Sequence, residues 1–295
     1  MIPEDLIHEL NALDLSASED LLFRPSGQKA WLSRTFHEIP RYLFRVFTLK
    51  SQGETTAAWT RSMAAKEAVP KSKLDIFAQD DKCVARVLCR HLWWRKGPDD
   101  NFVSWTSSLL FALVYIFHLH ASLRDGSEFH DIFLCVIDTT KFAAGTFLRD
   151  MDLIKAYGPN DADLRELEKI RLKDFYFGEY LSQGALKFQD KCKIVPASEM
   201  IEHGLLTLRP DFESFATWST EKRPPWAYPT LLLRTNGRNI DEEKLLALIE
   251  VAELFGPRWK LPMAANLASC LGASEDIVRS FVGLHWTGPS SLTPT

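Results

Sequence analysis

The chain has 295 residues, 46% of them hydrophobic and 12% aromatic, with a formal net charge of −4. This hydrophobic content suffices for a folded core, and the acidic balance gives no indication of nucleic-acid binding, which a basic excess usually signals. The longest apolar run, Leu109 to Phe117, is about half of a membrane span, and the amino terminus does not resemble a secretory signal.

We therefore expect an intracellular, cytoplasmic protein with no membrane partner. The five cysteines are widely spaced, with no CxxC pair and no zinc-ligand spacing, so no metal site is expected either.

The first two thirds of the chain mix helical and strand patterns. In chain order we predict a helical lead-in over 1–40, a strand over 42–48, a polar loop over 50–72, a helix over 73–94, a turn over 97–100, a strand over 102–106, a helix over 108–121 and a strand over 132–138. After these we predict a connection over 141–158, a helix over 161–173, strands near 178–182 and 190–195, and a helix over 198–206.

Prolines between Arg223 and Pro229 interrupt regular structure. Beyond them we predict helices over 241–255 and 262–271, and a third from Ser274. This pattern divides the chain into a mixed α+β domain over 1–210 and a helical segment over 225–295. Because the boundary depends on prolines alone, the helices could instead belong to the main core.

Three segments carry residues suited to chemistry. Arg45 lies on an apolar strand, Ser104-Trp105-Thr106 ends a strand directly before a helix, and Glu179 opens a later strand. A strand that delivers hydroxyls to a helix N-terminus can hold a polar ligand, because the first N–H groups of a helix are unpaired.

In this order the segments resemble the R-S-E branch of the ADP-ribosyltransferase superfamily, the cholera-toxin-like group. Arg45 matches the arginine of the first core strand, Ser104 the leading serine of Ser-Thr-Ser, and Glu179 the catalytic glutamate, with Gly184 at the expected bend. The resemblance covers roughly residues 40–190, and the segments also resemble a fungal domain of unknown function.

The resemblance implies an ADP-ribosyltransferase-like split β-sheet core with flanking helices and a C-terminal helical segment. It implies NAD as the substrate and no metal. Arg45 is expected to hold the pyrophosphate and ribose through paired N–H donors, and Ser104 to bind the ribose or support Glu179. Thr106 is expected to supply the hydroxyl of the last serine in the Ser-Thr-Ser motif. Glu179 is expected to stabilise the positive charge that develops as nicotinamide leaves.

Two departures from the family pattern are informative. Trp105 replaces the middle threonine, where an indole either packs beneath the strand or enlarges the stacking surface. Phe177 stands where arginine-modifying members carry Glu or Gln, which disfavours arginine as the acceptor. Trp105, Tyr176 and Tyr157 are the candidate rings to stack on nicotinamide, and Phe177 completes the expected cofactor-binding set.

The sequence therefore predicts an enzyme that transfers ADP-ribose from NAD to an unknown, non-arginine macromolecular acceptor. The alternatives are an NAD glycohydrolase and a catalytically degenerate binding module.

Each residue also has a structural interpretation. Arg45 could pair with Asp138, Ser104 and Thr106 could be strand-edge hydroxyls, and Glu179 could be exposed on an edge strand. We expect the histidines at positions 91, 118 and 120 to be core or surface residues, and Asp138 to be a cap.

Overall fold

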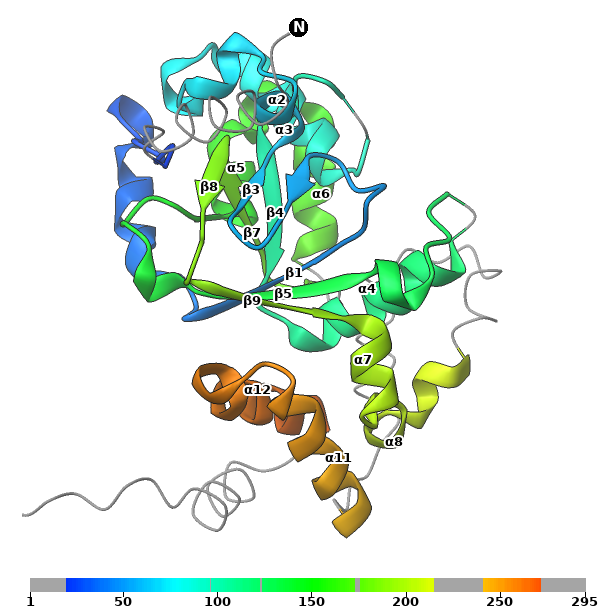
Figure 1. The fold of residues 1–295 in the computed structure, drawn as a ribbon. Coiled ribbons are helices and arrows are strands. Elements are labelled where there is room, and N and C mark those ends of the chain that lie inside the picture. Colours follow the sequence, from blue (N-terminus) through cyan, green and yellow to red (C-terminus); the bar gives the residue numbers. More distant parts are fainter. Residues whose placement is uncertain (1–19, 96, 123, 173–175, 215–240, 272–295) are drawn as a thin grey trace, which may run out of the picture.

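The computed structural model describes residues 20–95, 97–122, 124–172, 176–214 and 241–271. Two antiparallel sheets form its centre, surrounded by helices (Figure 1). The larger sheet has the strand order β6-β7-β4-β1-β5-β9, with bounds β1 (Tyr42–Phe47), β4 (Phe102–Thr106), β5 (Phe133–Asp138), β6 (Leu148–Arg149), β7 (Glu179–Gln183) and β9 (Cys192–Pro196). The smaller sheet has the order β2-β3-β8, with bounds β2 (Glu54–Thr55), β3 (Trp59–Arg61) and β8 (Ala185–Lys187). The fold is thus of the mixed α+β class.

The large sheet opens between two of its central strands. β1 pairs with β5 along its whole length, but with β4 only at Phe44 and Thr106. On the side of β4 away from β1, β7 pairs with β4 along its whole length. Beyond β7 the chain continues through Gly184 into β8 of the small sheet. Gly184 has a φ of +65°, which L-residues with a side chain rarely adopt, so the bend between the sheets needs a glycine.

The helices lie around the sheets. Their bounds are α2 (Met63–Lys66), α3 (Asp81–Leu92), α4 (Leu109–Ala121), α5 (Asp150–Tyr157), α6 (Ala162–Arg171), α7 (Ala197–Glu202), α8 (Leu205–Leu208), α11 (Glu242–Glu253) and α12 (Pro257–Cys270). The 3₁₀ segments are η1 (Gly27–Glu38), η2 (Pro70–Lys73), η3 (Ile76–Ala78), η4 (Phe129–Asp131), η5 (Thr139–Lys141), η6 (Gly158–Asn160) and η7 (Pro210–Ser214).

Local sequence explains where the principal helices begin. The Asp80 side chain accepts a hydrogen bond from the Cys83 N–H at the start of α3, and the Ser108 side chain does the same from Phe111 at the start of α4. α4 is apolar on nearly every side and almost wholly buried, so it lies between the large sheet and other helices.

Three hydrophobic clusters fill the molecule. The first joins α4, α7, α8, α11 and α12 to β1, β5 and β9, and the second joins α3, α5 and α6 to β4, β6 and β7. The third lies between the two sheets and contains the fully buried Trp105 with Phe147 and Phe188. Phe102 and Leu181 belong to the second cluster and Trp105 and Tyr180 to the third, as the alternation of side chains along β4 and β7 requires.

The predicted strands over 42–48, 102–106, 132–138, 178–182 and 190–195 are confirmed, as are the helices over 108–121, 161–173 and 241–255. The prediction of a loop over 50–72 is wrong, because β2, β3, α2 and the start of η2 lie there, and the connection over 141–158 contains β6 and α5. The helix predicted over 73–94 begins only at Asp81, and the helix predicted from Pro262 begins at Pro257, where proline occupies its first turn.

The C-terminal helices share a core with the sheet. α11 packs against α8 and α12, and α12 also contacts α4 (Figure 1, orange). The Trp259 ring of α12 lies edge-on to Tyr42 of β1 at 6.2 Å. The predicted domain boundary at residues 223–229 and the third predicted helix, from Ser274, both lie outside the described residues. No helix in the described part of the chain is long and apolar enough to cross a membrane.

Candidate active site

A cavity of about 330 Å³ opens at the point where β1 and β4 separate. Arg45, Ser104, Thr106 and Glu179 all line it. The first and last turns of α4 and the end of α3 also contribute lining residues. The three segments singled out in the sequence therefore meet at one site.

Sheet register explains how these residues come together. β7, β4 and β1 are neighbours in the sheet, and Glu179 lies directly opposite Thr106. Residues opposite each other in an antiparallel pair share a face, and so do residues two apart along a strand. Ser104, Thr106 and Glu179 therefore point to the same face. The alternative interpretation of Glu179 as an exposed residue on an edge strand is wrong, since β7 lies between β6 and β4 and Glu179 is 1% exposed.

Arg45 bridges the opening between the two strands. Its Nη1 donates to the Ser104 backbone oxygen at 3.0 Å and its Nε donates to Thr55 Oγ1 at 3.2 Å. Burial lowers the pKa of Arg45 from its ordinary value. The alternative partner Asp138 is instead 3.5 Å from Arg41, and it caps η5 as predicted.

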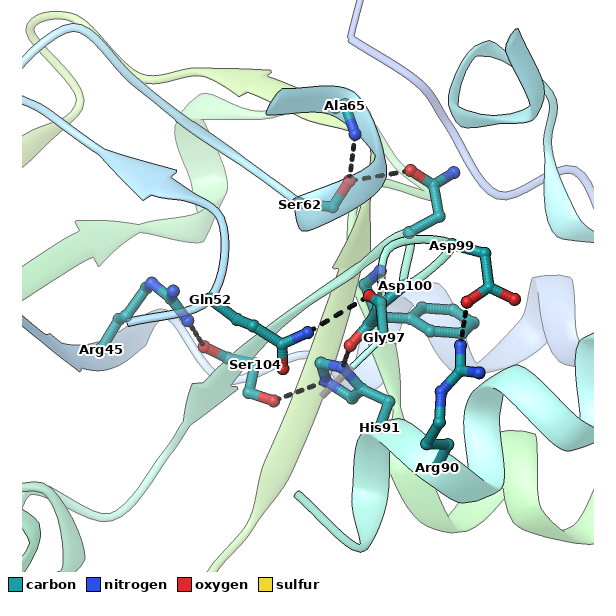
Figure 2. Close-up of polar contacts among 12 residues, drawn as sticks. Arg45, Gln52, Ser62, Ala65, Arg90, His91, Gly97, Asp99, Asp100 and Ser104 are labelled. Atoms are coloured by element: carbon teal, nitrogen blue, oxygen red, sulfur yellow. Dashed lines mark hydrogen bonds and ion pairs between the residues drawn. The ribbon is translucent and has the colours of Figure 1, made fainter. Parts of the chain in front are cut away.

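Ser104 ends a partly buried chain of hydrogen bonds. Its Oγ lies 2.8 Å from His91 Nε2, and His91 Nδ1 lies 2.7 Å from Asp100 Oδ2 (Figure 2). Burial lowers the pKa of His91, but the Asp100 carboxylate and the charge of Glu179 more than offset it, so this pKa is raised above 6.5. The prediction of His91 as a plain core or surface residue missed this contact.

Glu179 lies in a second buried network. Its Oε2 accepts a hydrogen bond from Arg171 Nη2 at 2.5 Å. Arg171 Nε lies 3.4 Å from Asp150 Oδ2, and the Tyr176 hydroxyl donates to Asp150 Oδ1 at 2.8 Å. Burial raises the pKa of Asp150 to about 7, although the Arg171 charge opposes this. Two buried carboxylates thus share one guanidinium.

Of the three rings expected to stack on nicotinamide, only that of Trp105 belongs to a residue that lines the cavity. Trp105 is 1% exposed, packs edge-on to Phe147 and Phe188, and donates from Nε1 to Ser182 Oγ. Its indole therefore packs beneath the strand and offers no stacking surface. Tyr157 is fully buried against the helices, and the Tyr176 hydroxyl is directed to Asp150; neither residue lines the cavity.

Phe177 lines the cavity as expected, stacked on Phe111 at 3.9 Å between ring centroids and 13° between planes. Tyr115 and Trp94 also line it, and their rings lie 5.5 Å apart. Phe111, Tyr115 and Trp94 were not singled out from the sequence, although Phe111 and Tyr115 lie one helical turn apart on α4.

The Thr106 hydroxyl holds the segment that precedes Glu179. It donates to the Phe177 backbone oxygen at 2.6 Å, and the Ser107 N–H donates to Gly178 O at 2.8 Å. Thr106 is 5% exposed, so its hydroxyl positions Phe177 and is largely withdrawn from the cavity.

Charged and titratable residues near the ends of β1 and α4 also line the cavity. Lys50 and Arg124 line it and are exposed, and His118 and Asp125 lie nearby among the lining residues. Burial lowers the pKa of His118. His120 faces away and stacks on Phe129 at 4.0 Å. Among the described residues, no cluster of His, Cys, Asp and Glu side chains is arranged to hold a metal ion.

Comparison with known proteins gives one family. The model of a domain of unknown function, DUF7587, matches residues 38–187, just over half of the chain, and the chain belongs to this family. The matched region contains Arg45, His91, Ser104 and Glu179. No curated protein matches the chain, and no solved structure matches it.

Proposed function

We propose that this protein is an NAD-dependent enzyme of the R-S-E ADP-ribosyltransferase kind. It cleaves the bond between nicotinamide and ribose and transfers ADP-ribose to an acceptor other than arginine. One observation carries the proposal: Arg45, Ser104 and Glu179, from three neighbouring strands, line a single cavity.

The cavity suits the nicotinamide end of the dinucleotide. Its volume of about 330 Å³ is at the lower end of small-molecule pockets, so it accommodates the ring and its ribose more readily than the whole cofactor. The rings of Phe111, Tyr115 and Trp94 are apolar surfaces against which nicotinamide can pack.

Positive charge is available for the two phosphates. Arg45 is held by its contacts with Ser104 and Thr55, and its guanidinium can pair with phosphate oxygens. Lys50 and Arg124, exposed at the same cavity, add cationic charge that favours an anionic pyrophosphate.

Glu179 supplies the carboxylate that the reaction requires. As the C1′–N bond breaks, its electron pair leaves with nicotinamide and positive charge develops on the ribose. The Glu179 carboxylate is fixed by Arg171 before substrate arrives, and such preorganised groups stabilise developing charge effectively.

Phe177 favours hydrolysis as a second candidate function. It is 6% exposed and stacked on Phe111, and its side chain has no polar atom with which to align a guanidinium. With water as the acceptor, the same site is an NAD glycohydrolase.

Product analysis with NAD labelled in the adenylate half tests the proposal. Label on a macromolecule, with cell lysate as the source of acceptors, supports transfer, and label only in free ADP-ribose supports hydrolysis. Unchanged NAD, together with no heat of NAD binding at millimolar ligand, contradicts both and favours a binding module. Michaelis constants extend to about 1 mM, so this concentration is a fair test.

A further inference from the structure

We infer that His91 and Asp100 form a proton relay with Ser104, and that the group which attacks the ribose in this cavity is a hydroxyl, of water or of an alcohol. The inference rests on the proposed function for the identity of the reaction. The relay itself rests on the geometry alone.

The relay is built from two elements and a turn. His91 is in the last turn of α3, Asp100 is in the segment that precedes β4, and Ser104 is in the middle of β4 (Figure 2). Its two hydrogen bonds are 2.7 Å and 2.8 Å long, and all three residues line the cavity. The chain of contacts therefore ends at the space where substrate is expected.

Backbone contacts fix the direction of the relay. Asp100 Oδ1 accepts the Phe102 N–H at 3.1 Å, which leaves Oδ2 for His91. A carboxylate accepts only, so in neutral His91 the proton lies on Nδ1 and is donated to Asp100. Nε2 is then an acceptor, directed at the Ser104 hydroxyl. This is the order of contacts by which a serine hydroxyl is activated in Ser-His-Asp triads.

Three charged groups from separate elements influence the charge of the His91 ring. Asp100 and Glu179 favour the imidazolium, and Arg45 on β1 disfavours it. The ring of Phe102 covers His91 with 5.5 Å between ring centroids, which excludes solvent from that side. The acids outweigh the burial, so His91 can accept a proton and keep it while the reaction proceeds.

The relay provides a base that the position two residues before Glu179 lacks. Phe177, at that position, cannot take up a proton, so it cannot activate the attacking group. The proton of the attacking hydroxyl passes to Ser104 Oγ as the Ser104 proton passes to His91 Nε2. The new O–C1′ bond forms, the C1′–N bond breaks, and Asp100 balances the imidazolium charge. His91 and Asp100 are positioning residues here, acting through Ser104.

Nitrogen-15 NMR of His91 tests the relay without any activity assay. We expect neutral His91 to carry its proton on Nδ1. Asp100→Asn should reverse this, because the amide can donate to Nδ1 and the Asn Oδ1 can still accept from Phe102. Asp99→Asn is the matched control, since Asp99 pairs with Arg90 and does not contact His91.

Kinetics then tests the role of the relay. We expect Asp100→Asn to reduce kcat for nicotinamide release about 10²–10⁴-fold, with NAD affinity unchanged. The wild-type rate should rise with pH through the pKa of His91 measured by NMR, because the neutral ring is the base.

Products identify the source of the hydroxyl. Free ADP-ribose identifies water as the attacking group, and methyl ADP-ribose formed on adding methanol shows that the site also accepts an alcohol hydroxyl. ADP-ribosylated agmatine, formed from an added guanidine probe, overturns the hydroxyl assignment.

A proton on Nε2 in neutral wild-type His91, or wild-type release with an unchanged pH profile in Asp100→Asn, overturns the relay. Absence of release by the wild type contradicts the proposed function instead, and the NMR result still decides whether the relay exists.

Discussion

At the scale of single residues, Arg45 makes two contacts that depend on the shape of its guanidinium. Nε and Nη1 bond Thr55 on the small sheet and the Ser104 backbone on the large sheet. A lysine ammonium is a point charge without this fork, so it cannot keep both contacts and still face a phosphate.

Arg45→Lys should therefore raise the dissociation constant for NAD at least about tenfold, as expected for loss of roughly 1.4 kcal/mol of binding. The measurement is titration calorimetry. Arg41→Lys, at an exposed arginine that pairs with Asp138, is the matched control and should leave binding unchanged. Equal effects of the two substitutions would show that Arg45 does not contact the ligand.

Asp150 provides a prediction about pH. Burial raises its pKa to about 7 from the usual 3.8, so folding takes up a proton between these values. The free energy of unfolding should therefore be highest at the acid end of this window. It should fall as pH rises to about 7, by at most about 1.4 kcal/mol per pH unit.

Denaturant unfolding at about pH 5 and about pH 8 measures this difference. The side chain in Asp150→Asn has no titratable proton. The loss of stability on raising the pH should therefore be smaller in this variant than in the wild type. The same pH dependence in both proteins would assign the titration to another group.

At the scale of elements, the bend between the two sheets limits the choice of residue. A Cβ on Gly184 would lie 3.1 Å from both the Ser72 backbone oxygen and a Leu21 methyl carbon, at a φ of +65°. Gly27 has a similar φ of +56°, and a Cβ there would meet nothing within 4 Å. Substitution of Gly27 therefore measures the cost of the left-handed backbone alone, without steric overlap.

Gly184→Ala and Gly27→Ala should both destabilise the fold, by about 1–2 kcal/mol for the left-handed backbone. Gly184→Ala should add about 1–3 kcal/mol from overpacking. Thermal unfolding of the two variants measures the difference. Equal losses of stability in the two variants would show that the residues around Gly184 shift to accept the Cβ at no energetic cost.

The strands that carry Arg45, Ser104 and Glu179 could be predicted because each is a short segment containing aromatic and aliphatic residues. β2 and β6 could not, since two residues carry no periodicity. The start of α12 was misplaced because Gly256-Pro257 was assigned only to the end of α11, although proline also suits a helix start.

The contacts inside the site were harder to predict than its strands. Arg45, Ser104 and Glu179 were found through a resemblance, and the sheet then placed them together. His91 was missed because its partners Asp100 and Ser104 follow α3, and only the return of the chain into β4 brings them to the ring. Arg171 was missed for a different reason, since a charged residue on a helix usually faces solvent.

At the scale of the whole molecule, α11 and α12 complete the core beneath the site. Leu248 of α11 is 2% exposed in the cluster that also contains Phe44 and most of α4. Because α4 lines the cavity on its other side, packing of the C-terminal helices supports the site.

Leu248→Ala should therefore cost about 2–5 kcal/mol in the free energy of unfolding, in a single transition with the sheet. Leu246→Ala, on the same helix but 55% exposed, is the control and should change stability by no more than about 0.5 kcal/mol. A separate early transition in Leu248→Ala, detected by circular dichroism, would show that the C-terminal helices fold independently.

The central claim is that Glu179 promotes loss of nicotinamide from NAD. The most direct test is the rate of nicotinamide release by the wild type, Glu179→Gln and Glu166→Gln, the last a matched change at an exposed glutamate on α6. Circular dichroism first establishes that Glu179→Gln is folded, because it removes one partner of the buried Arg171. We predict a decrease of about 10²–10³-fold in Glu179→Gln and none in Glu166→Gln. Equal release by the wild type and Glu179→Gln, or no release by the wild type with lysate present, would contradict the account.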